Sequence, residues 1–178
     1  MGKALGVALG LILAFASSAT AADQKMHACS LLTAAEIGAV VGGKVGDSRE
    51  SDIVIPEGPA KGETMGSCMW RVGDQGMVSV SVIRAAQGAQ REAGLAKMNQ
   101  AFETLKAKGW KEEKKVYGNA RCAMLTPPTS QAENTPVSTG CMAEAKGMGI
   151  SVGSMAPKKS AAIDQVKALL DKAISRLP

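Results

Sequence analysis

The sequence predicts an α+β fold, in which helices flank an antiparallel β-sheet and two disulfides stabilise the domain. Short segments with alternating apolar residues, typical of strands, occur in runs that are separated by helical patterns. This order favours an antiparallel sheet with helices packed on it. The four cysteines all follow an export signal, and an even number in an oxidising compartment indicates two disulfides.

Residues 1–21 have the features of a secretory signal peptide. Lys3 precedes an apolar run at 4–15, and Ala19-Thr20-Ala21 is a small-x-small cleavage motif. The apolar run is shorter than the ~20 residues that a membrane span needs. We therefore expect cleavage, no membrane span afterwards, one domain over 22–178, and a location in the periplasm or outside the cell. An uncleaved N-terminal anchor is the alternative.

The charge pattern argues against a nucleic-acid partner. The whole chain carries a formal net charge of +5, and loss of Lys3 leaves +4, from 20 basic minus 16 acidic residues. Many of the lysines lie between 106 and 115, where Glu112 and Glu113 interrupt them. Such mixed signs indicate a solvated surface rather than a polyanion site.

The first helix has a complete set of boundary signals. Thr33 is the expected N-cap and Glu36, three residues on, completes a capping box. Gly42-Gly43 ends the helix. One or two strands are expected within 44–55, followed by a loop at 56–62 that is rich in proline and glycine.

A β-hairpin at 67–83 is the clearest strand signal. Cys68 and Trp70 share one face of its first strand, and alternating valines form one face of its second. The turn between the strands falls at 73–76. Because tryptophan buries a large apolar area, we expect Trp70 to be a structural anchor of the core beside Cys68.

The second half of the chain repeats this alternation. Residues 87–108 form a helix with an apolar stripe at Leu95, Met98, Phe102 and Leu105. The remaining expected elements are strands at 111–116, 121–126, 138–145 and 148–154, a loop at 127–136, and an amphipathic helix at 160–177.

The four cysteines allow three connectivities. Cys122 and Cys141 lie on two consecutive expected strands and could face each other across a ladder. Cys29 begins the first helical segment and Cys68 lies on the hairpin. We therefore favour the pairs Cys29–Cys68 and Cys122–Cys141.

Several short motifs together resemble a known family. They are Cys29-Ser-Leu-Leu-Thr-Ala-Ala-Glu36, Cys68-Met-Trp70 before an alternating-valine strand, Val116-Tyr-Gly-Asn-Ala120, and a terminal amphipathic helix. They are similar to a family of secreted bacterial proteins of unknown function, many of them actinobacterial lipoproteins, that are similar in fold to the PsbP subunit of photosystem II. The resemblance implies an α/β/α sandwich and provides no catalytic residues. The chain lacks a lipid-attachment cysteine directly after the apolar run, which favours a free periplasmic protein.

For function, the sequence indicates a non-enzymatic binding or accessory module of the cell envelope, without a cofactor, acting on an unknown protein or envelope component. The expected contact surfaces are the sheet face and the loops at 56–66 and 127–136. With His27 as the one histidine and no CxxC pair, the chain has no obvious catalytic triad, thioredoxin-type site or structural zinc site. An enzyme with carboxylate or serine chemistry is a remaining alternative.

The methionines allow a further alternative, a soft-metal site for copper. Thioethers bind Cu(I), and His27 would add a ligand near the mature N-terminus. Methionine is also a flexible filler of cores, so core packing is the favoured expectation. The methionines concerned are Met65, Met69, Met77, Met98, Met124, Met142, Met148 and Met155.

Overall fold

The computed structural model describes residues 27–57, 61–84, 89–131, 135–157 and 160–178. The predicted signal peptide lies outside these residues. Within them, the strands are β1 (Val45–Val54), β2 (Thr64–Val72), β3 (Gly76–Arg84), β4 (Lys111–Tyr117), β5 (Ala120–Thr126), β6 (Val137–Ala145) and β7 (Met148–Ala156). The helices are α1 (Ala34–Val41), α2 (Ala89–Ala107) and α3 (Ile163–Ser175), with short 3-10 helices η1 (Ala28–Ser30) and η2 (Thr129–Gln131).

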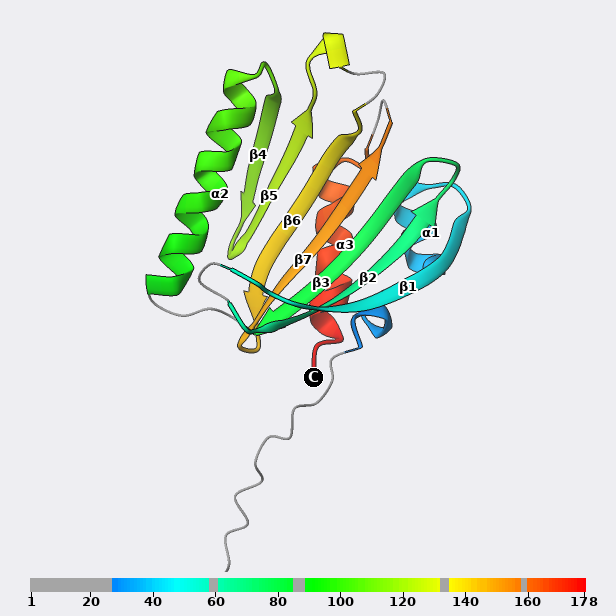
Figure 1. Cartoon of the computed structure of the whole chain (residues 1–178). Helices are drawn as coiled ribbons and strands as arrows, with labels where there is room; N and C mark the ends of the chain where they lie inside the picture. The colour runs from blue at the N-terminus through cyan, green and yellow to red at the C-terminus, as the bar shows by residue number, and fades with distance from the viewer. Residues whose placement is uncertain (1–26, 58–60, 85–88, 132–134, 158–159) are drawn as a thin grey trace, which may run out of the picture.

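The seven described strands form one antiparallel sheet in the order β1-β2-β3-β7-β6-β5-β4. Strands β1 to β3 and β4 to β7 are two meanders, and pairing of β3 with β7 joins them (Figure 1). Helices α1 and α3 cover one face of this sheet, whereas α2 runs alongside β4. The predicted α+β class, an antiparallel sheet with flanking helices, is confirmed.

The core lies between the sheet and the layer formed by η1, α1 and α3. Alternate residues of each central strand point into it, because successive side chains of a strand face opposite sides. The valines of the hairpin behave in this way, and Trp70 is only 3% exposed among them. Helices α1 and α3 thus bury one face of the sheet, and neither of them covers the other face.

Both disulfides lie on the core side of the sheet, with the predicted pairing confirmed. Cys29–Cys68 joins η1 to β2, and Cys122–Cys141 joins β5 to β6. Cys122 and Cys141 are direct partners in the β5–β6 ladder, 4.0 Å apart between Cα atoms. The second disulfide therefore cross-links two neighbouring strands.

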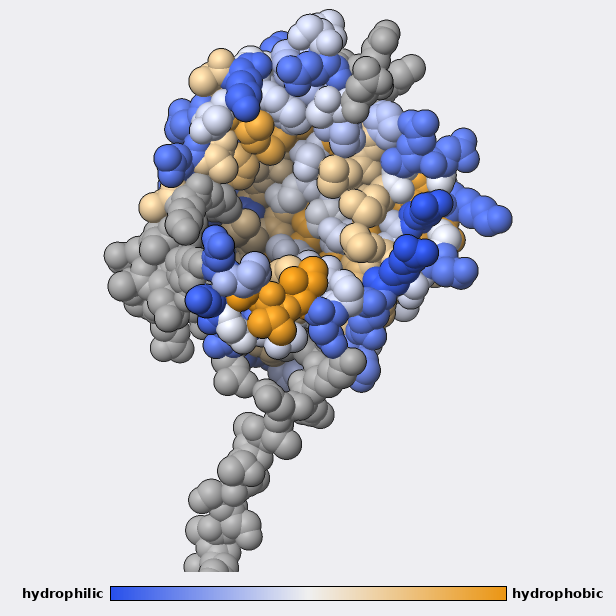
Figure 2. All heavy atoms as spheres, in the orientation of Figure 1, coloured by the Kyte–Doolittle hydropathy of each residue, from blue (hydrophilic) through white to orange (hydrophobic). Residues whose placement is uncertain are grey.

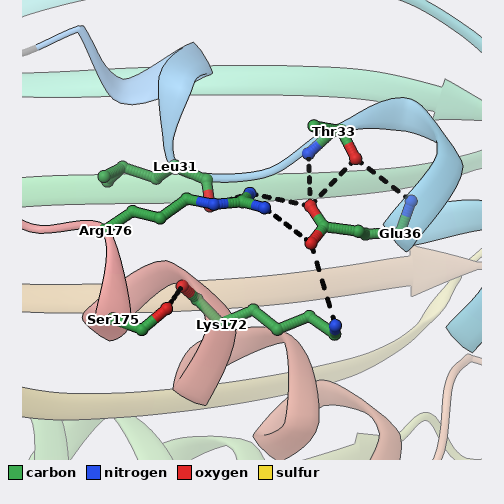
Figure 3. Close-up of polar contacts among 6 residues, drawn as sticks. All are labelled: Leu31, Thr33, Glu36, Lys172, Ser175 and Arg176. Carbon is green, nitrogen blue, oxygen red and sulfur yellow. Dashed lines mark hydrogen bonds and ion pairs between the residues drawn. The ribbon is translucent and has the colours of Figure 1, made fainter.

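Helix α1 begins with a capping box and is joined to α3 by charged side chains (Figure 3). The Glu36 carboxylate accepts hydrogen bonds from the backbone N–H and hydroxyl of Thr33. It also accepts two 2.7 Å hydrogen bonds from the Arg176 guanidinium, which in addition donates to the carbonyl of Leu31. The Lys172 ammonium lies 3.7 Å away. The C-terminal end of α3 is thus tied to the start of α1.

Helix α3 begins at Ile163, three residues later than the sequence predicts. The reason is Ser160, whose hydroxyl donates a 2.8 Å hydrogen bond to the Ser154 carbonyl and holds this segment against the end of β7. The helix is amphipathic as expected, and its apolar side is buried through Ile163, Val166, Leu169, Leu170 and Ala173.

Other boundaries also differ from the expectation. Residues 64–66, expected in a loop, extend β2 because they pair with β1. In α2, the stripe residues Phe102 and Leu105 are half-buried, whereas the side chains of Leu95 and Met98 lie outside the described part of the chain.

Candidate functional site

The face of the sheet that α1 and α3 leave uncovered is called the open face here. Directly paired residues of neighbouring strands lie side by side on the same face, so the register sorts the side chains of the open face into rows that cross the strands. One row, called the serine row, contains Ser51, Ser67, Ser81, Ser151, Met142, Arg121 and Val116.

The next row, called the central row, contains Arg49, Met69, Ser79, Gly153, Gly140, Ala123 and Lys114. A third row contains Arg71, Met77, Met155, Ser138, Leu125 and Glu112. The middle of the central row, from Ser79 to Ala123, holds no side chain larger than that of serine. The rows beside it hold larger side chains, among them Met142, Met155 and Leu125, with serines between them. The sheet surface is therefore lowest along this row.

A cavity of about 510 Å³ lies over this low region. Its floor includes Ser79, Gly153, Gly140 and Ala123, and Leu125 and Met142 border it. Figure 2 shows the same face hollowed in its middle, with hydrophilic side chains along much of the rim. The volume falls within the range of roughly 300–1,000 Å³ that is usual for small-molecule sites.

Helix α2 provides one wall of the cavity through Asn99 and Phe102. This helix is placed by contacts with the open-face side chains of β4. The Lys114 ammonium lies 5.3 Å from the centre of the Phe102 ring. Lys106 Nζ of α2 lies 3.2 Å from Glu112 Oε2, and Lys114 Nζ lies 2.9 Å from Glu112 Oε1.

The Glu112 side chain is only 3% exposed, which makes its charge state important for the placement of α2. Burial raises the pKa of Glu112, but the ion pairs with Lys114 and Lys106 outweigh burial, so that this pKa lies below its ordinary value. Hydrogen bonds from Lys106 to Glu103 and Glu112 raise the pKa of the Lys106 ammonium. Glu112 and Lys106 therefore stay charged at neutral pH, and their ion pair holds α2 against β4.

The charge of the cavity lining is of one sign. Lys114, Lys115 and Arg121 line the cavity, and among the described side chains no aspartate or glutamate does so. Lys115 pairs with Asp164 at 3.2 Å on the α3 side, and Lys114 is engaged by Glu112. Within the part of the chain that the structure describes, Arg121 forms no ion pair and no side-chain hydrogen bond.

The structural residues named from the sequence lie away from this cavity. Trp70, Cys68 and Cys29 are on the core side of β2, and Thr33 and Glu36 cap α1 behind the sheet. The expected contact surface at the sheet face is where the cavity lies. None of the described residues in the expected loops at 56–66 and 127–136 lines the cavity.

The methionines are divided between the two faces, so the core-packing expectation is wrong for several of them. Met124 and Met148 pack against the core. Met69, Met142 and Met155 are each more than a third exposed, because they belong to the rows of the open face. His27 instead contacts Glu50, whose ladder partner Cys68 is on the core face. The histidine and the open-face thioethers are therefore on opposite sides of the sheet.

Within the described residues, there is no group of three or more His, Cys, Asp or Glu side chains arranged to hold a metal ion. Nor does any of the described helices have the length and apolar character needed to cross a membrane.

Comparison with known proteins adds information on the fold alone. No protein-family description matches the chain, and no curated protein matches it. Among solved structures, the chain is similar to the extracellular domain of PknH from Mycobacterium tuberculosis, with a TM-score of 0.53 and 13% sequence identity. The match covers 83% of this chain and 92% of that domain. The two disulfides, which are typical of oxidising compartments, indicate an exported protein.

Sequence reasoning missed the residues that form the cavity, Arg121 and the glycines of the central row among them. A signal for the glycines was present, because Gly140 and Gly153 interrupt otherwise regular strand patterns. Glycine inside a strand often marks a place where a ligand or another chain segment approaches the backbone closely.

Proposed function

We propose that this protein is a non-enzymatic binding module, located in the periplasm or secreted, that holds a small molecule in the cavity on the open face of its sheet. The observation that carries the proposal is the floor of the cavity, where four strands contribute only glycine, alanine and serine side chains in one row. The family resemblance of the sequence, which provides no catalytic residues, supports the same role.

A binding role is also favoured over an enzymatic one by the chemistry of the lining. Its serines are Ser79, Ser138 and Ser151, and none of the lining residues that the structure describes is a histidine, aspartate or glutamate. A nucleophilic serine needs a base within hydrogen-bond reach. The serines of the lining are therefore better suited to donating hydrogen bonds to a ligand.

The site differs from a surface that binds an extended peptide by strand addition. Strand addition uses the free backbone groups of an edge strand, and the edges of this sheet are β1 and β4. The cavity floor is formed by strands that are paired on both sides. Its ligand must therefore be recognised by side chains and by shape.

Gly140 offers a direct test. A Cβ atom added there meets only the Val152 carbonyl oxygen, at 4.0 Å, so a larger residue fits the strand and projects into the cavity. We expect Gly140→Ile to fold and to lose ligands that are retained by the native protein after periplasmic expression. The measurement is native mass spectrometry together with a thermal-shift screen of small molecules.

Gly46→Ile is the matched control. Gly46 lies in β1, and an added Cβ there is in ordinary contact with Arg71, outside the cavity. This variant should bind like the native protein. If every ligand found binds equally well to Gly140→Ile, the cavity is not the binding site and the proposal is wrong.

A further inference from the structure

The shape of the cavity restricts the form of its ligand. The cavity extends along the central row from Ser79 on β3 to Lys114 on β4, across four inter-strand steps. At a strand spacing of about 4.8 Å, this distance is about 19 Å. The low row runs across the strands. Arg121 and Met142 raise the sheet surface on one side of it, and Met77, Met155 and Leu125 raise it on the other. An elongated molecule that lies perpendicular to the strands fits this trough.

The sides of the trough are mainly apolar at the end nearer to α2. Phe102 of α2, Leu125 of β5 and Met142 of β6 line it there. Met142 is 39% exposed and Val116 is 70% exposed, so apolar surface continues to the mouth of the cavity. Burial of such surface by a ligand is favourable by about 25 cal/mol per Å². An apolar chain is the ligand segment that gains this contribution.

Arg121 supplies a charged group on the serine-row side of the trough, at the end nearer to α2. In the serine row it stands directly between Met142 on β6 and Val116 on β4. Among the residues that the structure describes, it is the cation of the lining whose charge is not matched by a carboxylate. Guanidinium groups bind carboxylate and phosphate through paired N–H donors. An unmatched arginine beside apolar side chains is thus suited to the acidic group of an amphiphile.

We propose that the cavity binds an elongated amphiphile whose carboxylate or phosphate group pairs with Arg121 and whose apolar chain lies in the trough over Ala123, Gly140 and Gly153. This inference rests on the proposed function and adds the ligand class to it.

The test measures the affinities of dodecanoate, dodecyl phosphate and the neutral dodecanol by displacement of a fluorescent fatty acid. All concentrations stay below the micelle concentrations of the two anions and the solubility limit of dodecanol. Both anions should bind the native protein more tightly than dodecanol. Arg121→Gln should weaken binding of the anions by roughly tenfold, the low end expected for a hydrogen bond to a charged group. The same substitution should leave the affinity for dodecanol unchanged.

Arg71→Gln is the matched control, because Arg71 is an arginine of the same open face, next to Met77, and does not line the cavity. It should bind all three probes like the native protein. A comparison of the two anions separates a carboxylate ligand from a phosphate ligand, and inorganic phosphate alone should bind neither variant nor the native protein tightly.

The two levels of the proposal fail in different ways. If dodecanol binds as tightly as the anions, if Arg121→Gln has no effect, or if no probe binds, the anionic-amphiphile inference is overturned. If any of these ligands binds, but binds Gly140→Ile as tightly as the native protein, the site itself is misplaced and the proposed function falls with it.

Discussion

Replacement of Glu36 by glutamine is expected to destabilise the protein in a pH-dependent manner. Glu36 has two roles: it completes the capping box with Thr33, and it receives the paired hydrogen bonds of Arg176. A glutamine side chain is able to keep the capping contact but carries no charge. Glu36→Gln therefore isolates the charged interaction that joins the end of α3 to the start of α1.

The magnitude follows from the pKa of the Glu36 carboxyl. The hydrogen bond from Arg176 lowers this pKa from 4.5 to about 2. At about 1.36 kcal/mol per pKa unit, a shift of this size corresponds to at most about 3.4 kcal/mol. The side chain is 20% exposed, and water screens the pair. We therefore expect Glu36→Gln to lose about 1.5–2 kcal/mol of stability at pH 7.

The assay is urea denaturation of both proteins between pH 7 and pH 2. Because the pKa is lower in the folded state, the Glu36 contribution is present above pH 4.5 and declines as the pH falls toward about 2. The difference in the free energy of unfolding should shrink over the same interval. A difference that is constant with pH, or absent at pH 7, would refute the reasoning.

Three other perturbations have defined outcomes. Alanine at both Cys122 and Cys141 should lower the free energy of unfolding by about 3 kcal/mol, the loop-closure value for a loop of this size, in urea titrations; an unchanged midpoint would contradict this. Lys106→Met removes one cation from buried Glu112, so amide hydrogen exchange should accelerate in α2 but not in α3; equal acceleration of both helices would count against the described role of this ion pair. A Cu(I) titration against bicinchoninate should detect no micromolar site, because arginines adjoin the open-face thioethers; stoichiometric binding that Met77→Leu abolishes would reverse that conclusion.

The sequence was sufficient for the fold class because its signals are local. The capping residues Thr33 and Glu36, the alternating valines of the hairpin and the apolar stripe of α3 each identify an element within a few residues. The pairing of Cys122 with Cys141 could be predicted for the same reason, since the two cysteines lie on consecutive strands. The first residue of α3 could not be predicted from local signals, because a tertiary contact of Ser160 determines where this helix begins.

The cavity could not be predicted, because it depends on the register between distant strands. Ser79 and Gly153 become neighbours only when β3 pairs with β7, and nothing in either segment specifies that alignment. The exposure of Met142 could not be predicted either. It depends on which face of the sheet the helices cover, and that is a property of the tertiary fold. Nothing near Arg121 in the sequence marks it, because its apolar neighbours Met142 and Val116 lie on other strands.

The strand order has a consequence for how the chain crosses a membrane during export. The first meander, β1 to β3, completes its sheet only by pairing with β7, the last strand to emerge. The helix that covers the core, α3, follows later still. A chain that leaves the translocation channel from its N-terminus therefore lacks a closed core until β7 and α3 have passed. Contacts between residues so far apart in sequence form slowly. The chain therefore stays unfolded while it passes through the channel.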